Sequence, residues 1–167
     1  MIYTKEINIR DIKISAPELI SDGWALVTAG SEKDCNTMTI SWGSLGELWG
    51  KDVAVVYIRP QRYTREYLDR EEYFTVSFYD EKFRNALKIC GAKSGRNCDK
   101  ISESGLSPVE TDGTVTFKEA KYTLVCRKIA VQALDPKGFL DPEIETNYSK
   151  KDYHIIYTGE IIKAYEN

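Results

Sequence analysis

The stretch CNTMTISWG at residues 35–43 decides the expected fold. Small hydroxyl residues alternate in it with larger apolar residues, which is the period-two pattern of a half-buried strand. The polar face holds Thr37, Thr39 and Ser41, and the apolar face holds Met38, Ile40 and Trp42. With Asn36, the hydroxyls suit hydrogen bonding to a flat polar ring, and the apolar side chains suit packing on its face. The alternative is an amphipathic strand whose threonines face water.

Outward from this stretch, most segments also favour strands. Strands are predicted at 24–30, 52–58, 72–80, 118–134 and 153–165. Short helices are expected over 64–69 with Thr64 as N-cap, over 81–91 with Gly91 as the stop, and over 97–105 ending at Gly105. Three strands precede the first helix, so simple βαβ alternation fails. The predicted fold is mainly β, an antiparallel barrel with inserted short helices.

One long polar segment interrupts the last two strands. Residues 135–152 contain two prolines and are expected to form a loop or lid. The chain of 167 residues is the size of one domain, taken as 1–167. No repeat or linker divides it.

Composition excludes several classes of function. The net charge of -3 and pI near 5.4 argue against nucleic-acid binding, which needs a basic face. No apolar run is long enough for a signal peptide or a membrane helix, so we expect a cytoplasmic protein without membrane contact. The four cysteines have no C-x-x-C spacing and are expected to be free thiols, with no metal site.

The single histidine, His154, leaves no HExxH motif and no histidine cage. On the predicted last strand it shares a face with Ile156, Thr158 and Glu160. It is a candidate catalytic group, and the alternative is a structural or surface histidine.

Two further segments are candidates for binding an anion. IRPQRYT (58–64) places two arginines and a threonine where a strand leads into a helix, whose first N–H groups attract phosphate. CGAKSGRNCDK (90–100) combines glycines, a serine and cations in a backbone able to wrap an anion. Each segment is also compatible with an ordinary solvated turn or surface loop.

Taken in order, these motifs resemble the flavin reductase-like family, which contains flavoredoxins and FMN-binding split-barrel reductases. The resemblance rests on NTMTISWG, IRPQRYT, SFY, SGRNCDK and HIIYTGE, which run from Asn36 to Glu160. It implies a split β-barrel of antiparallel, Greek-key type. It also implies a homodimer with one FMN per subunit near the interface.

The resemblance assigns roles to individual positions. Asn36, Thr37, Met38, Thr39, Ser41 and Trp42 would line the isoalloxazine, while Arg59, Arg62, Tyr63 and Thr64 would hold the phosphate. Ser94, Gly95, Arg96 and Lys100 would close over the ribityl chain and phosphate, and His154 would lie on the nicotinamide side. Asn97 stands where the family pattern has an acidic residue, which weakens the assignment within that loop.

The function expected from the resemblance is an oxidoreductase that moves electrons from NADH or NADPH through FMN. The acceptor would be a small molecule or a redox protein. FMN would be either a fixed prosthetic group or a diffusing substrate. The alternatives are a non-catalytic FMN-binding β-barrel module for flavin storage or sensing and, third, a purely structural barrel.

Overall fold

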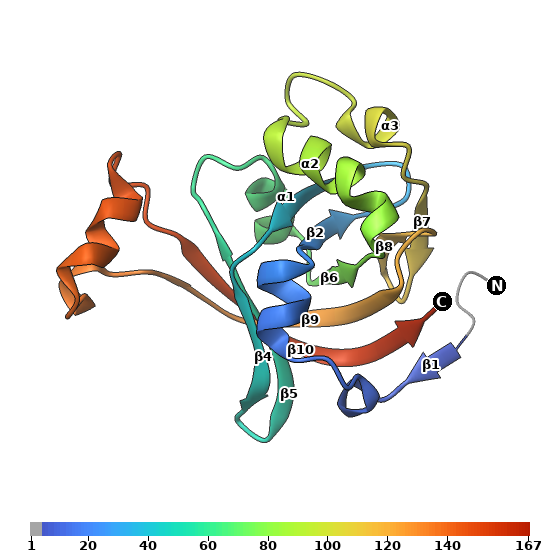
Figure 1. The fold of residues 1–167 in the computed structure, drawn as a ribbon, viewed down its shortest axis with the longest axis horizontal. Coiled ribbons are helices and arrows are strands. Elements are labelled where there is room, and N and C mark those ends of the chain that lie inside the picture. Colours follow the sequence, from blue (N-terminus) through green and yellow to red (C-terminus); the bar gives the residue numbers. More distant parts are fainter. Residues whose placement is uncertain (1–4) are drawn as a thin grey trace.

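A computed structural model describes residues 5–167, which form one strongly curled antiparallel sheet with helices on one side (Figure 1). The main sheet has the order β3-β2-β6-β9-β10-β5-β4, and β1 pairs with the end of β10. Its strands are β1 (Lys5–Ile7), β2 (Ala25–Gly30), β3 (Cys35–Ile40), β4 (Gly43–Leu48), β5 (Lys51–Ile58), β6 (Tyr73–Phe78), β9 (Tyr122–Ala133) and β10 (Ile155–Glu166). A separate hairpin joins β7 (Pro108–Thr111) and β8 (Thr114–Phe117).

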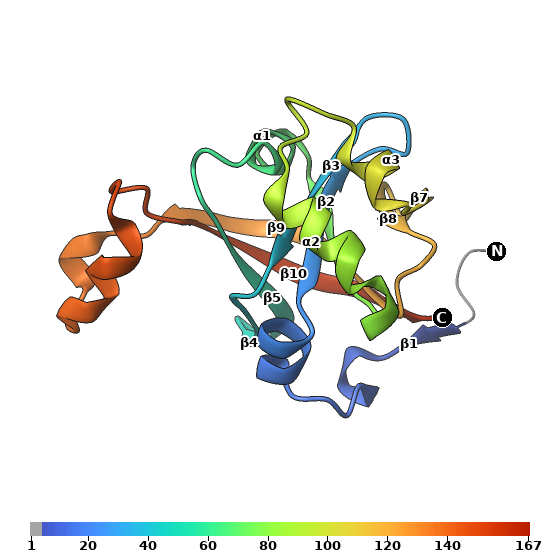
Figure 2. The ribbon, with the colours of Figure 1, turned by 45° about the horizontal axis from the view of Figure 1, so that its top comes forward.

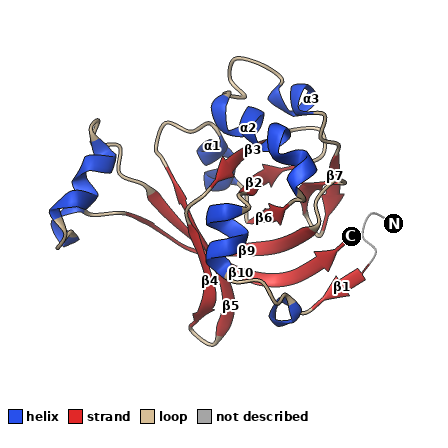
Figure 3. Cartoon of the chain, in the orientation of Figure 1, coloured by secondary structure: helices blue, strands red, loops and turns tan. Residues whose placement is uncertain are grey.

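The helices are short and gather over β2 and β3 (Figure 3). The α-helices are α1 (Thr64–Arg70), α2 (Arg84–Ala92) and α3 (Lys100–Ser104). The other helical segments are the π-helix η2 (Glu18–Asp22) and the 3-10 helices η1 (Ile9–Asp11), η3 (Glu81–Phe83), η4 (Pro136–Gly138) and η5 (Pro142–Tyr148). None of the helices in residues 5–167 is both long and apolar enough to cross a membrane.

Strand β2 is buried on both faces because it lies between two apolar clusters. Val27 belongs to the cluster inside the barrel, together with Val56 and Phe74. Its neighbour Leu26 belongs to the outer cluster, together with Leu87 of α2. Because successive side chains of β2 point to opposite faces of the sheet, this one strand contributes residues to both clusters. This double burial fixes the β2–β3 hairpin, and with it the start of the candidate site.

Strand β10 is the spine of the barrel. It pairs with β9 along its length, with β5 over its first half and with β1 at its end. The β9–β10 register shifts next to Gly159, where an added Cβ would lie 2.6 Å from the Phe74 ring. Glycine is required there by close packing, and the irregularity lets the sheet curl.

The segment 135–152, hereafter the arm, projects away from the barrel in both views (Figures 1 and 2). It contains η4 and η5, and its two ends continue β9 and β10. Most of the arm lies away from the barrel, although Tyr148 reaches back to it, and the expected role as a loop or lid stays a prediction. All four cysteines of the chain are free thiols.

The opening stretch CNTMTISWG is not one strand. β3 ends at Ile40, the chain bends at Ser41, and Gly43 starts β4, which pairs with β5. Its threonines do not face water. Thr37 is fully buried with its hydroxyl 2.8 Å from that of Thr28, and Thr39 donates to the Leu87 carbonyl of α2.

Helix boundaries also differ from the prediction. Thr64 is the first helical residue rather than the N-cap, since its Oγ1 accepts a hydrogen bond from Asn36. Gly91 lies within the last turn of α2, where it allows close contact with Thr39. Gly105 ends α3 with φ +75°, as predicted. β9 begins at Tyr122, four residues later than expected, after a turn that follows β8.

Candidate functional site

The bend after β3 lies between two cavities that share Ser41, Trp42, Tyr57 and His154. The Trp42 side chain is 47% exposed, unlike the other apolar residues of its stretch. The first cavity, the arginine pocket, holds about 240 Å³ of water-accessible space and is lined by Met38, Thr39, Ile40, Ser41, Trp42, Tyr57, Arg59, Arg62, Gly91 and His154.

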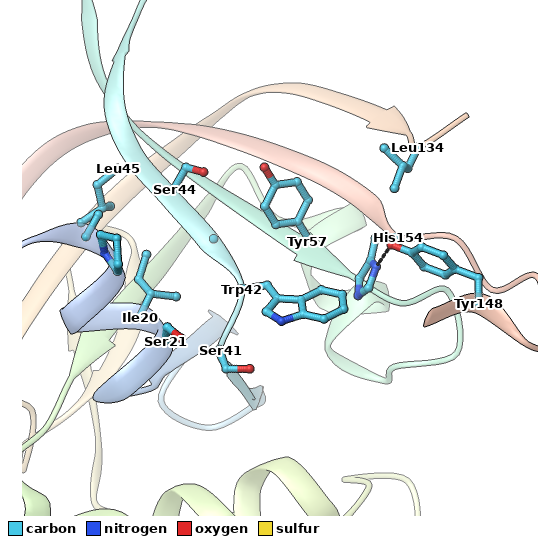
Figure 4. Close-up of a pocket in the computed structure, with 13 residues that line it drawn as sticks. Ile20, Ser21, Ser41, Trp42, Ser44, Leu45, Tyr57, Leu134, Tyr148 and His154 are labelled. Carbon is cyan, nitrogen blue, oxygen red and sulfur yellow. Dashed lines mark hydrogen bonds between the residues drawn. The ribbon is translucent and has the colours of Figure 1, made fainter. Parts of the chain in front are cut away.

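The second cavity, the Trp42 groove, holds about 660 Å³ of water-accessible space, in the range typical of small-molecule sites (Figure 4). Its lining residues are Ala16, Pro17, Ile20, Ser21, Ser41, Trp42, Gly43, Ser44, Leu45, Tyr57, Leu134, Tyr148 and His154. The lining is apolar with a few hydroxyl groups. No Asp, Glu, Lys or Arg is among these thirteen residues.

Arg62 brings an unbalanced positive charge to the arginine pocket. Its guanidinium is half-buried and donates through Nη2 to the Gly91 carbonyl at 3.0 Å. Within residues 5–167 no carboxylate lies within ion-pair distance of it. Burial lowers the pKa of Arg62, which shows that its charge is poorly solvated. The side chain is therefore suited to an anionic ligand.

Lys100 adds a second buried cation close to Arg62. Its Nζ donates to the carbonyls of Cys90 at 3.0 Å and Lys93 at 3.1 Å, at the end of α2. Burial, followed by the charge of Arg62, lowers the pKa of Lys100 to about 8. Lys100 does not line either cavity, so its contribution there is electrostatic.

Arg59 differs from Arg62 because its charge is already paired. Its Nη1 lies 2.9 Å from Asp152, and its Nη2 donates to the Asn147 carbonyl at 2.9 Å. The guanidinium also lies over the ring of Tyr148, 5.1 Å from its centre. Arg59 thus ties the base of the arm to the wall of the arginine pocket.

His154 stands directly before β10 at the border of both cavities, between Trp42 and Tyr148 (Figure 4). Its Nδ1 is 2.8 Å from the Tyr148 hydroxyl, and its ring centre is 5.4 Å from that of Trp42. Burial lowers its pKa to about 4, and the positive charge of Arg59 contributes. The imidazole is consequently neutral near pH 7. It is buried, which excludes the alternative of a surface histidine.

The structure brings together seven of the fifteen residues that the sequence predicted. Those that line the arginine pocket are Met38, Thr39, Ser41, Trp42, Arg59, Arg62 and His154. Those that line neither cavity are Asn36, Thr37, Tyr63, Thr64, Ser94, Gly95, Arg96 and Lys100. Ligand contacts for both groups stay predictions.

Several residues of the second group connect β3, α1 and the loop after α2. Asn36 donates to Thr64 at 2.7 Å and contacts Gly95, where an added Cβ would lie 2.3 Å from the Asn36 amide oxygen. Arg96 pairs with Glu66 and lies over the ring of Tyr63. Its guanidinium is therefore engaged with the protein, and this network holds the loop against α1.

Several lining residues were missed by the sequence analysis. Tyr57 lies two residues before Arg59 at the end of β5, so period-two alternation was a sufficient signal to find it. Tyr148 could not be predicted from the sequence around it, which is polar and has no strand pattern. It reaches the site only because the arm folds back toward the barrel at this residue. No group of three or more potential metal-ligating side chains occurs within residues 5–167.

Comparison with known proteins identifies the family. The family model described as flavin reductase like domain matches residues 18–167. No curated protein matches the chain. The fold is similar to that of an FMN-binding domain of a flavin reductases-like enzyme from Shewanella baltica OS155, with TM-score 0.69 and 17% identity over 97% of this chain and 76% of the other.

Two further solved structures show the same fold. A flavoredoxin from Methanosarcina acetivorans has TM-score 0.66 and 24% identity, over 87% of this chain and 68% of its own. An NADH:FAD oxidoreductase from Streptomyces globisporus C-1027, in complex with NAD and FAD fragments, has TM-score 0.65 and 18% identity, over 87% and 74%. These likenesses confirm the predicted split β-barrel. Since the family model covers most of the sequence, the chain belongs to the flavin reductase-like domain family.

Proposed function

We propose that the protein binds FMN and is an oxidoreductase that passes electrons from NADH or NADPH to a second acceptor. The observation that carries this proposal is Arg62, a half-buried cation that faces a cavity without a carboxylate partner within residues 5–167. The exposed ring of Trp42 borders the same cavity. A phosphorylated aromatic ligand satisfies both features, because its phosphate pairs with Arg62 and its ring packs on apolar side chains.

The donor set fits the chemistry of FMN. Thr39 and Ser41 offer hydroxyls along one wall, and Arg62 offers several guanidinium N–H groups, of which only Nη2 has a partner within residues 5–167. Lys100 strengthens the positive potential beside Arg62. We assign Arg62 to the phosphate, whereas Arg59 is occupied by Asp152 and positions the arm.

When bound, FMN supplies hydride acceptance and electron transfer, which no amino-acid side chain provides. The chain's residues bind and orient the reactants. Trp42 offers an aromatic surface to both cavities, and His154 offers a neutral imidazole to both. A neutral group there adds no charge that would have to be desolvated when a second reactant enters the groove.

The comparisons support the nicotinamide donor only by analogy, since one solved relative is named an NADH:FAD oxidoreductase and carries NAD fragments. We include in the proposal a cytoplasmic location, where such donors are abundant, and a homodimeric state. A redox protein or a small molecule is the proposed acceptor, and the flavoredoxin among the relatives supports the former.

The first experiment measures FMN binding by absorbance and fluorescence titration of the purified protein. We expect Arg62→Ala to weaken FMN binding by roughly ten- to a hundredfold, as the loss of a charge-assisted hydrogen bond predicts. The matched control is Arg65→Ala, because Arg65 lies in the same segment but pairs with Asp69 and lines neither cavity. Equal affinities for the two variants would contradict the assignment of Arg62.

Anaerobic addition of NADH or NADPH then tests the reaction. Bleaching of the flavin absorbance supports the oxidoreductase. Rapid multiple turnover of free FMN identifies flavin as a substrate, whereas a single stoichiometric reduction identifies a prosthetic group. Tight binding without reduction by either nicotinamide would instead favour flavin storage or sensing.

A further inference from the structure

The hydroxyl of Tyr148 has one hydrogen-bond partner in residues 5–167, the Nδ1 atom of His154 at 2.8 Å. Tyr148 is itself 5% exposed and held firmly by its neighbours. Its ring stacks on Phe139 with centres 6.0 Å apart, contacts Tyr153 at 4.9 Å, and lies below the Arg59 guanidinium. Tyr148 therefore has a fixed position from which it acts on a single atom.

The direction of this hydrogen bond follows from the groups present. Burial raises the pKa of Tyr148, so the phenol keeps its proton at neutral pH and needs an acceptor. The neutral imidazole of His154 offers the Nδ1 lone pair. In the reverse arrangement Nδ1–H would donate, and the phenolic proton of a buried residue would lack a partner. Donation from Tyr148 to Nδ1 is therefore favoured, which leaves the imidazole proton on Nε2.

The other nitrogen of His154 is free to contact a ligand. Nε2 makes no hydrogen bond within residues 5–167, and His154 lines both the arginine pocket and the Trp42 groove. Trp42 at 5.4 Å and Tyr57 at 6.5 Å flank its ring. The charged groups that act on the imidazole are Arg59 and Asp152, which pair with each other. The Trp42 groove itself contains no formally charged side chain.

We propose that Tyr148 is a positioning residue that fixes His154 in the tautomer with the proton on Nε2, and that His154 thereby donates a hydrogen bond to the molecule in the Trp42 groove. The groove then selects an uncharged group that presents an acceptor oxygen, such as an amide or ketone carbonyl, while charged parts of the same molecule lie outside it. The identification of the bound molecule as the second reactant rests on the proposed function. The tautomer is a property of the protein alone.

Because His154 is the only histidine, nitrogen-15 NMR of uniformly labelled protein reports its tautomer without ambiguity. At pH 7 we expect the wild-type spectrum to show a proton on Nε2 and a bare Nδ1. In Tyr148→Phe part of the population should move to the Nδ1–H form. The matched control is Tyr153→Phe, which removes a hydroxyl from the neighbouring ring that bonds to Glu145, not to His154. It should keep the wild-type tautomer.

A wild-type proton on Nδ1 would overturn the proposal without any variant, and so would an unchanged tautomer in a folded Tyr148→Phe. A second readout uses the FMN-loaded protein with NADH or NADPH. Tyr148→Phe should lower kcat/KM roughly tenfold, the scale of one lost hydrogen bond, with FMN affinity unchanged, whereas Tyr153→Phe should not. Equal kcat/KM values for the two variants would contradict the positioning role. If the wild type fails to bind FMN, the proposed function fails, and the NMR spectrum alone decides the proposal on Tyr148.

Discussion

The burial of His154 makes the stability of the protein depend on pH in a defined window. Its pKa is about 4 in the folded protein and near 6.5 when exposed. Between these values the unfolded chain binds more protons, so stability falls as the pH drops from about 6.5 to about 4. This single group accounts for up to about 3 kcal/mol of that loss.

The measurement is urea unfolding at pH 7, 5 and 4 for the wild type and for His154→Gln, which cannot titrate. The hydrogen bond from Gln61 lowers the pKa of Asp152, so protonation of this and similar carboxylates also reduces the free energy of unfolding at low pH. That reduction occurs in both proteins. The difference between the two curves isolates His154. Parallel pH profiles would show that the imidazole is not buried in its neutral form.

Three positions of the candidate site could be predicted from residue type and local pattern. Trp42, Arg62 and His154 combine unusual chemistry with a predicted strand or turn, and all three line the arginine pocket, while their ligand contacts stay predictions. For Lys100 the sequence leaves two roles open, because a cation that donates to the end of α2 has the same local sequence as one that faces a ligand. Only the packing of α3 on α2 decides between these roles.

Among the elements, β10 has a tight steric requirement at Gly159. An added Cβ at Gly159 would lie 2.6 Å from Phe74 Cζ and 2.7 Å from Cys126 Cβ, all within the buried sheet. We therefore expect Gly159→Ala to lower the free energy of unfolding by about 1–3 kcal/mol through overpacking. Thermal and urea denaturation measure this loss.

Gly46→Ala is the matched control for that substitution. Gly46 also lies in a strand, β4, but no atom lies within 4 Å of an added Cβ there. We expect a change of within about 0.5 kcal/mol, as for other unconstrained surface sites. A neutral Gly159→Ala would mean that the β9–β10 irregularity can absorb a methyl group.

Element prediction depended on how much of each strand is buried. The long strands β5, β6, β9 and β10 gave clear apolar runs and were found, with errors only at their ends. β4 was missed because GSLGEL is largely exposed and rich in glycine, so it lacks an alternating signal. The short strands β1, β7 and β8 fell below the length at which periodicity is recognisable.

At the scale of the whole molecule, the arm exposes apolar side chains to solvent. Leu140 is 97% exposed and Ile144 is 36% exposed, and both lie outside the barrel. In the proposed homodimer these residues contribute to the interface, since exposed apolar groups on a projecting segment mark contact surfaces. We expect analytical ultracentrifugation to give the wild type a mass of twice 19.1 kDa. The dimer dissociation constant of the double variant Leu140→Asp, Ile144→Asp should be roughly a hundredfold higher.

The control for this experiment is Ile162→Asp, an exposed apolar residue of β10 away from the arm. It should leave the sedimentation coefficient unchanged. A monomeric wild type would remove the homodimer from the proposed function, and a dimer that survives both charges on the arm would place the interface elsewhere.

The two ends of the arm have a consequence for how the protein responds to its surroundings. Leu134 lies directly before the arm and His154 two residues after it. They are joined by a backbone hydrogen bond of 2.9 Å, and both border the Trp42 groove. A partner that binds the arm and shifts these two residues must alter the affinity of the groove for its ligand. By thermodynamic reciprocity, ligand binding in the groove then changes the affinity of the arm for that partner by the same factor.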